Sequence, residues 1–592
     1  MAAEAPARDF LACEATHFRI ERHGRQLALA HAVGAVVLLA IGGLMALLIA
    51  IQRVEAVQFI NDDWWYRLVA AHGAAMLLFW MLLFEVAALY WGSTMLLNAP
   101  MRLVKVAWTA FGMMVLGVLL ATGMMLAGQA TVMFTAYPPM EANPLFYLGV
   151  ILVAVGVLIA VAIFFVNVVA AKREGYHRGS LPLVVYGLAA AAIIAVYSLG
   201  TGAVAYVSLF LWSVGLVENV DPAFYRMFFW GIGHGAQQVN LAAMVAVWYA
   251  LVGFTVGGRT ISESLSRLAF LLLIAFIHLG AVHHLLVDPG LGTSHRLMNT
   301  SYLLYLAVLA SLIHAFCIPS AIEVAQRERH GFTKGLFQWL VRAPWKEPGF
   351  SSLVLSLVFF GFIGGVTGVI MSSMQMNMLV HNTLFVPGHF HGTVVAGATL
   401  AFMGIAYYLL PLLSRRNLVG VAVARLQPYV FFAGVALFSL GMIRAGFYGV
   451  PRRSADLSYQ AAPLPTDSFI QTGPQLAMWA VLIGALIAVV GGAMFIYVML
   501  ATLFAGKVVD RPDVGLVLAY GAQERERGLP APTMVAADGH SLIGGHEPHD
   551  RKISWRNFEA PGTVTLVFIF LAWFVVMYAL AHFNIARLWP VG

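Results

Sequence analysis

Apolar residues gather into about thirteen long stretches, separated by short polar connections. Each stretch is long enough to cross a hydrocarbon core of roughly 30 Å as a helix. The stretches begin near Gln26, Trp65, Val104, Pro144, Leu181, Ala223, Glu263, Met298, Gly349, Phe385, Pro428, Thr472 and Gly562. Many exceed the minimum length for a span, which indicates tilted helices. The pattern therefore predicts an all-α integral membrane protein, one bundle over residues 1–592.

The composition strengthens this prediction. Of the 592 residues, 61% are hydrophobic and only 10% are charged, and the mean hydropathy is +0.84. So apolar a chain cannot be hidden inside a water-soluble globule. The long polar interruption at residues 507–559 is rich in proline, glycine and charge, and it predicts a cytoplasmic loop before the last helix.

Basic residues collect in alternate connections, whereas the other connections carry acidic residues and almost no lysine. The basic groups include Arg102 and Lys105, Lys172 and Arg173, Arg327 and Arg329, and Arg415 and Arg416. Positive loops stay on the cytoplasmic side of a membrane. These connections and the N-terminus are therefore predicted to be cytoplasmic. The net charge of +7 then reflects topology, and nothing points to a nucleic-acid partner.

Cysteine usage limits the chemistry of this chain. Cys13 and Cys317 lie far apart, so the sequence has no disulfide framework, no CxxC pair and no CxxCH heme-attachment sequence. Any thiolate-bound centre through which electrons arrive must therefore belong to another subunit.

Six histidines fall at one depth of the predicted bundle. With the N-terminus inside, counting residues along the helices places all six in the outer third of the membrane. They are His72, His234, His283, His284, His389 and His391. A histidine is costly within a bilayer unless something compensates for its desolvation, and a bound metal does so. The clustering predicts a membrane metalloenzyme.

The spacing of these histidines indicates two kinds of site. Residues two apart on a helix point to separate faces, so His389 and His391 can each serve a different planar macrocycle. His72 is then the natural second axial ligand of one heme, which becomes a six-coordinate electron carrier. The other heme keeps an open position for a small molecule.

The remaining three histidines predict a second metal site. His234, His283 and His284 supply three imidazoles and leave a vacancy, which suits copper or non-heme iron and is poor for magnesium or calcium. A heme iron and a second metal in one pocket make a site for a small diatomic molecule. Arg452 and Arg453, in an outer loop where positive charge is unusual, can pair with heme propionates.

Protons must reach such a buried site along polar side chains or water. On the cytoplasmic half, Tyr249 follows Gln238 on the same helix, and Ser311, His314 and Glu323 lie on the eighth helix. Glu85 is a further intramembrane carboxyl, for which pairing within the bundle is as good an interpretation as a proton role.

Six short segments of the sequence resemble segments of a known protein family. AHGAAM, TAYPPM, FFWGIGHG, HHLLVDPG, HNTLFVPGHFHG and VPRRSA occur in this order over nearly the whole chain. Together they resemble subunit I of the heme-copper oxidase superfamily, most closely its B-type branch. The resemblance implies a multi-pass protein of a prokaryotic cytoplasmic (inner) membrane. It also implies a smaller membrane-anchored subunit on the outer face, with a copper-A or heme domain, that receives electrons from cytochrome c or a similar donor.

The resemblance assigns roles to the histidines. His72 and His391 would ligate a low-spin heme b, His389 a high-spin heme of b or a type, and His234, His283 and His284 the second metal. Tyr137, Arg452 and Arg453 would lie near the propionates. In oxygen-reducing relatives a tyrosine stands four residues after the first histidine of the second metal site, but here that residue is Gln238.

Glutamine cannot donate an electron for splitting an O–O bond, but it can form a hydrogen bond or offer a weak carbonyl ligand. Reductive coupling of two NO molecules breaks no O–O bond, so the sequence favours a membrane-bound nitric oxide reductase. At the second metal site, copper is preferred to iron. The alternatives are a B-type terminal oxidase that reduces O2 with electrons from cytochrome c, and, more remotely, a bis-histidine electron-transfer cytochrome. Asn377 also replaces an aspartate above the hemes, which predicts weak or absent proton pumping.

Overall fold

The computed structural model describes residues 10–12, 19–276, 278–455, 472–509 and 559–588. The N-terminal half contains β1 (Phe10–Ala12), β2 (Arg19–Glu21), α1 (Arg22–Gln52), η1 (Glu55–Val57), α2 (Asp62–Ala74), η2 (Ala75–Phe79), α3 (Trp80–Thr94), α4 (Val104–Leu126), α5 (Pro144–Arg173), α6 (Leu183–Ser213), α7 (Pro222–Val256), α8 (Glu263–Phe276) and η3 (His278–Leu285).

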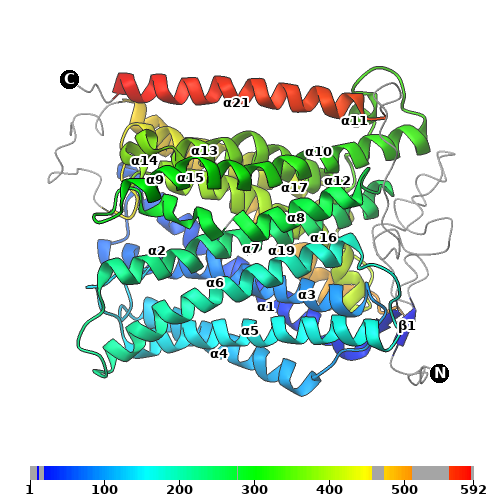
Figure 1. Cartoon of the computed structure of the whole chain (residues 1–592), viewed down its shortest axis with the longest axis horizontal. Coiled ribbons are helices and arrows are strands. Elements are labelled where there is room, and N and C mark those ends of the chain that lie inside the picture. The colour runs from blue at the N-terminus through cyan, green and yellow to red at the C-terminus, as the bar shows by residue number, and fades with distance from the viewer. Residues whose placement is uncertain (1–9, 13–18, 277, 456–471, 510–558, 589–592) are drawn as a thin grey trace.

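The second half contains α9 (Thr293–Thr300), α10 (Tyr302–His330), α11 (Gln338–Val341), α12 (Pro348–Phe359), η4 (Phe360–Gly365), α13 (Val366–Ser372), α14 (Met374–Val380), α15 (Phe385–Phe390), η5 (His391–Thr399), α16 (Leu400–Ser414), α17 (Val421–Phe447), α19 (Thr472–Ala505) and α21 (Pro561–Leu588). β1 and β2 form a short antiparallel pair. The long helices lie side by side with roughly parallel axes, α21 along one edge and α4 and α5 along the opposite edge (Figure 1).

Twelve helices in the described residues are long and apolar enough to cross a membrane, or thirteen if the bent pair formed by α8 and η3 is counted as one span. This confirms the predicted all-α membrane bundle. The predicted seventh span differs from a straight helix, because it bends by 50° before η3. Gly280, which has low helix propensity, lies in η3 close to His234. The predicted loop at residues 507–559 lies outside the described residues, apart from its ends.

Local sequence fixes where the site-bearing helix α7 begins and ends. Asp221 caps its first turn by accepting a hydrogen bond from the Phe224 N–H, and Pro222 occupies the first helical position. Gly257 ends the helix in a left-handed conformation. Within α7, Gly235 has no room for a side chain, because a Cβ there would lie 2.0 Å from Ser198 Oγ of α6. Small residues thus let α6 and α7 approach closely.

The helices that carry the histidines occupy the middle of the bundle. In the span containing His72, 89% of the most apolar 18-residue stretch is buried. The values are 94% for the span with His234 and 89% for the span with His389 and His391, against 6% for α21. Three π-helical turns interrupt this central region: η2 follows His72, η5 begins at His391, and η4 packs beside η5. Such turns change which way side chains and carbonyls point, and they are frequent at functional sites.

Candidate metal centres

The structure brings together the three histidines predicted to bind a second metal. One ring nitrogen from each of His234, His283 and His284 lies within 4.8 Å of the others. His234 Nδ1 is 3.1 Å from His284 Nε2, and Trp230 stacks on His284 at 4.0 Å between ring centroids. His283 Nδ1 is buried and has no hydrogen-bond partner among the described residues. Three clustered imidazoles, one of which has a ring nitrogen without a hydrogen-bond partner among the described residues, suit a bound transition metal.

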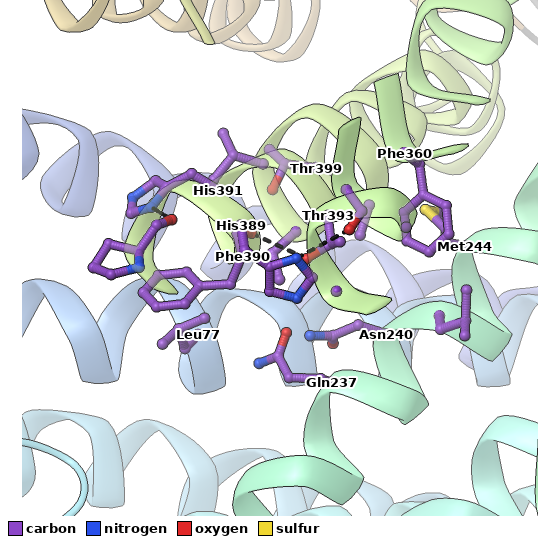
Figure 2. A pocket seen from close by; sticks show the side chains of 18 of the residues that line it. Leu77, Gln237, Asn240, Met244, Phe360, His389, Phe390, His391, Thr393 and Thr399 are labelled. Carbon is purple, nitrogen blue, oxygen red and sulfur yellow. Dashed lines mark hydrogen bonds between the residues drawn. The ribbon is translucent and has the colours of Figure 1, made fainter. Parts of the chain in front are cut away.

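Gln238 lies one turn after His234, with 3.4 Å between its Nε2 and His234 Nε2. The sequence prediction missed two further amides on the same helix. Gln237 and Asn240 line the cavity and lie across from the His389 ring (Figure 2). Asn240 Nδ2 is buried and has no hydrogen-bond partner in the described part of the chain. These amides could not be selected from the sequence, because glutamine and asparagine occur in many helices without a functional role and no motif marks them here.

All six histidines line one cavity of about 1470 Å³, together with Gln238, Arg452 and Arg453. A cavity for one drug-sized ligand measures roughly 300–1,000 Å³. The space is therefore large enough for more than one bulky group, and its walls are mostly apolar side chains, as a porphyrin requires.

His72 and His391 face each other across a gap that suits an iron atom. Their rings are nearly parallel, at 7°, with centroids 6.4 Å apart. A metal bound to both would lie about 2 Å from each nitrogen, and the two ring radii bring the centroid separation to roughly 6 Å. The other nitrogen of each ring is held by a backbone carbonyl: His72 Nδ1 by Gly42 O at 3.0 Å and His391 Nδ1 by Pro387 O at 2.7 Å. This second contact is typical of metal-binding histidines.

His389 points to a different side of the helix from His391 (Figure 2). Its Nδ1 is 3.0 Å from Gly364 O and 3.1 Å from Thr367 Oγ1. Gly368 leaves room for the ring, since a Cβ there would be 3.0 Å from His389 Cε1. His389 thus has the same support as the facing pair, with its Nε2 left for a ligand. Thr367 was not predicted, because nothing in the sequence links it to His389.

Positive charge gathers at the rim of the cavity. The Arg226 guanidinium lies 4.3 Å and that of Arg453 6.0 Å from the Tyr137 ring centre. Burial, and then the neighbouring Arg453, lower the pKa of Arg452 to about 9. Burial, with Arg452 as the largest of three arginine effects, lowers the pKa of His381 to about 3. Such an excess of cationic groups suits the carboxylates of heme propionates.

Two arginines that the sequence prediction missed organise this rim. Arg53, at the end of α1, is buried and donates hydrogen bonds to Pro451 O at 2.8 Å and to Ser454 O. It ties α1 to the loop that carries Arg452. Arg226 of α7 forms a two-bond ion pair with Asp288, at 2.5 and 2.7 Å. Asp288 lies just after η3, so this pair joins the two elements that carry the three clustered histidines.

Two of the residues predicted for a proton path, Tyr249 and His314, lie next to each other. The Tyr249 hydroxyl is 3.0 Å from His314 Nδ1 and 3.0 Å from Ser266 Oγ. Ser266 Oγ is in turn 3.0 Å from Thr260 Oγ1. All four side chains are buried. Ser266 and Thr260 were not predicted, because they lie beyond the helix that carries Tyr249 and only tertiary packing brings them near.

The remaining candidates have other surroundings. Ser311 lines the cavity, as does His314. Glu323 is fully buried but its carboxylate pairs with Arg327 at 2.8 Å and accepts hydrogen bonds from Gly562 N and Thr563 N. It therefore caps the start of α21 and stands apart from the Tyr249 group. Both carboxyl oxygens of Glu85 are buried without a hydrogen-bond partner among the described residues.

A helical membrane bundle with six histidines around one apolar cavity defines a class of membrane oxidoreductase, and comparisons give the family. A family model described as Cytochrome C and Quinol oxidase polypeptide I matches residues 26–490. Cytochrome c oxidase subunit 1 of Thermus thermophilus is 33% identical over 400 residues, 66% of this chain and 69% of that protein. The subunit from Synechocystis sp. is 23% identical over 438 residues, 70% and 73% of the two chains.

A cryo-EM structure of a heme-copper terminal oxidase dimer aligns with a TM-score of 0.77 and 25% identity, over 95% of this chain and 92% of that one. The chain belongs to the heme-copper oxidase subunit I family. Members of this family are respiratory oxidoreductases that hold hemes and a further metal at a binuclear site.

Proposed function

We propose that this chain is the catalytic subunit of a membrane-bound nitric oxide reductase of the B-type branch. Its reaction converts two NO, two electrons and two protons into N2O and water. The observation that carries the proposal is Gln238, whose amide lies 3.4 Å from the ring of His234. A redox-active phenol would occupy this position in an oxygen reductase of the family that this chain resembles.

The histidines divide among three groups. His72 and His391 would hold a low-spin heme b, His389 would hold a high-spin heme, and the cluster of His234, His283 and His284 would hold the second metal. Copper suits this cluster better than iron does, because the neighbouring groups are imidazoles and an amide, not carboxylates. When bound, the hemes and the second metal supply electrons and adjacent coordination sites for NO.

The chain's own side chains then orient substrate and move protons. The Gln238 N–H can donate a hydrogen bond to an NO oxygen, and Gln237 and Asn240 offer further amides across the cavity. The linked side chains of Tyr249, His314, Ser266 and Thr260 can pass protons toward the cavity, which His314 itself lines. Electrons arrive from cytochrome c or a similar donor through a smaller subunit on the outer face.

Oxygen reduction is the second candidate, and a specific observation favours it. The Thermus thermophilus relative, at 33% identity, is a cytochrome c oxidase subunit. Under this alternative Gln238 would be a packing residue without a role in the chemistry, and its removal would leave turnover unchanged.

The Q238L variant separates the two candidates. Leucine has a similar size but no hydrogen-bonding group. We expect anaerobic N2O formation to fall roughly 10- to 100-fold, since a hydrogen bond to the reacting molecule contributes about 1.5–3 kcal/mol. Heme and metal contents should match the parent enzyme. A Q238L enzyme that forms N2O at the parental rate would contradict the proposal.

A further inference from the structure

The π-turn η4 leaves one backbone carbonyl without its usual helical donor. In an α-helix the Val366 N–H would bond to Phe362 O, but here it bonds to Ile363 O. This bond spans only three residues, as in a 3₁₀ turn, at the point where the π-turn gives way to α13, and it leaves Phe362 O without the Val366 donor. Inside a membrane such a carbonyl needs another donor, because no water is present to supply one.

The donor comes from the last helix. Trp573 Nε1 of α21 donates a hydrogen bond of 2.7 Å to Phe362 O. Two residues along the same turn, Gly364 O lies 3.0 Å from His389 Nδ1. One π-turn therefore accepts a contact from α21 on one carbonyl and a contact from His389 on another.

The position of Trp573 in its helix is unusual. Tryptophan gathers at membrane interfaces, where its N–H reaches water. Trp573 instead lies near the middle of the 28 residues of α21, a helix of which only 6% of the most apolar stretch is buried inside this chain. The hydrogen bond to Phe362 O accounts for this placement, because it satisfies the indole N–H far from water. Phe570 adds packing, at 5.2 Å from the Phe362 ring.

We propose that Trp573 is a positioning residue for His389. Its indole N–H holds η4 in the π-turn that presents Gly364 O to the His389 ring. This inference rests on the proposed role of His389 as the ligand of the high-spin heme. A histidine that donates its second N–H to a carbonyl is a more basic ligand. Loss of the indole N–H lets the turn relax, which weakens that hydrogen bond.

The W573F variant in the complete complex tests this, because phenylalanine keeps an aromatic ring and removes the N–H. The readouts are the iron–histidine stretching band of the reduced high-spin heme and the midpoint potential of that heme. We expect the band to move to lower frequency and the potential to become more positive. The low-spin heme serves as an internal reference, and its spectrum and potential should not change.

Two control variants separate the hydrogen bond from packing. F570L disturbs the same contact with Phe362 but keeps the indole, and W479F removes an exposed tryptophan of α19. Both should leave the band in place. A band that stays in place in W573F, or that moves equally in F570L, would overturn the positioning role.

Two outcomes remain distinct from these. If W573F binds no high-spin heme, W573H decides: retention of the heme with this N–H donor supports the role, and its loss in both variants overturns it. If the parent enzyme itself shows no iron–histidine band, the assignment of His389 fails, which is a failure of the proposed function and not of the role of Trp573.

Discussion

Glu347 is a buried carboxyl group immediately before the span that α12 begins, and only 3% of it is exposed. Burial raises its pKa to about 8, although the hydrogen bond from the Tyr408 hydroxyl and the nearby Arg425 act in the opposite direction. The same carboxyl has a lower pKa in the unfolded chain. Between that pKa and about pH 8, the folded protein therefore keeps a proton that the unfolded chain has released. The contribution to stability is fully present in acid and is lost as the pH rises through about 8.

We predict that E347Q removes this dependence. Between pH 6 and pH 8 the unfolding temperature of the parent enzyme should fall, by an amount equivalent to a few kcal/mol at most, whereas that of E347Q should fall less. The unfolding temperature is measured by heating the enzyme and monitoring its heme absorbance. The control is E174Q, at a surface ion pair with Arg102. Equal slopes in the parent and E347Q would contradict the prediction.

The six histidines could be predicted from the sequence because they recur at one depth, and depth follows from counting residues along helices. The amides and arginines around them could not. Asn240 lies two residues after Gln238 on the same helix, but only the packing of α7 against the remaining helices shows that it faces the cavity. Arg53 looks like an ordinary helix-end residue until its contact with Pro451, 398 residues away, is seen.

At the scale of elements, the ion pair of Arg226 with Asp288 joins α7 to the segment after η3. Its two hydrogen bonds are partly shielded from solvent, since the side chains are 24% and 17% exposed. The three clustered histidines come from α7 and from η3, which ends three residues before Asp288. The pair therefore helps to fix the distance between His234 and the other two histidines of the cluster.

We predict that D288N weakens binding of the second metal by roughly 10- to 100-fold, as expected for loss of an outer support of a metal site. The measurement is the amount of second metal per high-spin heme after dialysis against a chelator. D63N is the matched control, because Asp63 forms an exposed ion pair with Arg67, and such pairs contribute little. Full metal retention in D288N would show that the ion pair does not support the site.

The starts of most helices were predicted to within a few residues, although α17 begins at Val421 and not near Pro428, and the irregularities of the helices were not predicted. Hydropathy located each span because a long apolar stretch in a bilayer must form a helix. The π-turns η2, η4 and η5 leave apolar content unchanged, so hydropathy does not reveal them. The bend before η3 was missed for the same reason, although it determines how His283 and His284 approach His234.

At the scale of the whole molecule, proton pumping by the proposed enzyme would require a group that takes up protons above the hemes. Asn377 stands where the family resemblance places an aspartate. It is buried, and its Nδ2 donates a hydrogen bond of 2.6 Å to Met371 O. An amide does not take up a proton at neutral pH. Asn377 therefore cannot act as a proton-loading group.

We predict that the complex, reconstituted in vesicles and turning over NO, moves close to zero protons outward per electron. The measurement is the pH outside vesicles whose membrane potential has been dissipated. An uncoupler serves as the control for proton leakage. Robust external acidification that the uncoupler abolishes would contradict the prediction and would require another proton-loading group.

The most direct measurement of the central claim compares two substrates on one preparation. Steady-state N2O formation from NO and consumption of O2 are measured side by side on the isolated complex, with hemes, copper and non-heme iron quantified. The account predicts two hemes and one further metal per complex, and NO turnover to N2O that is faster than O2 consumption. Fast four-electron consumption of O2 with negligible N2O would contradict it, and would identify the enzyme as an oxygen reductase.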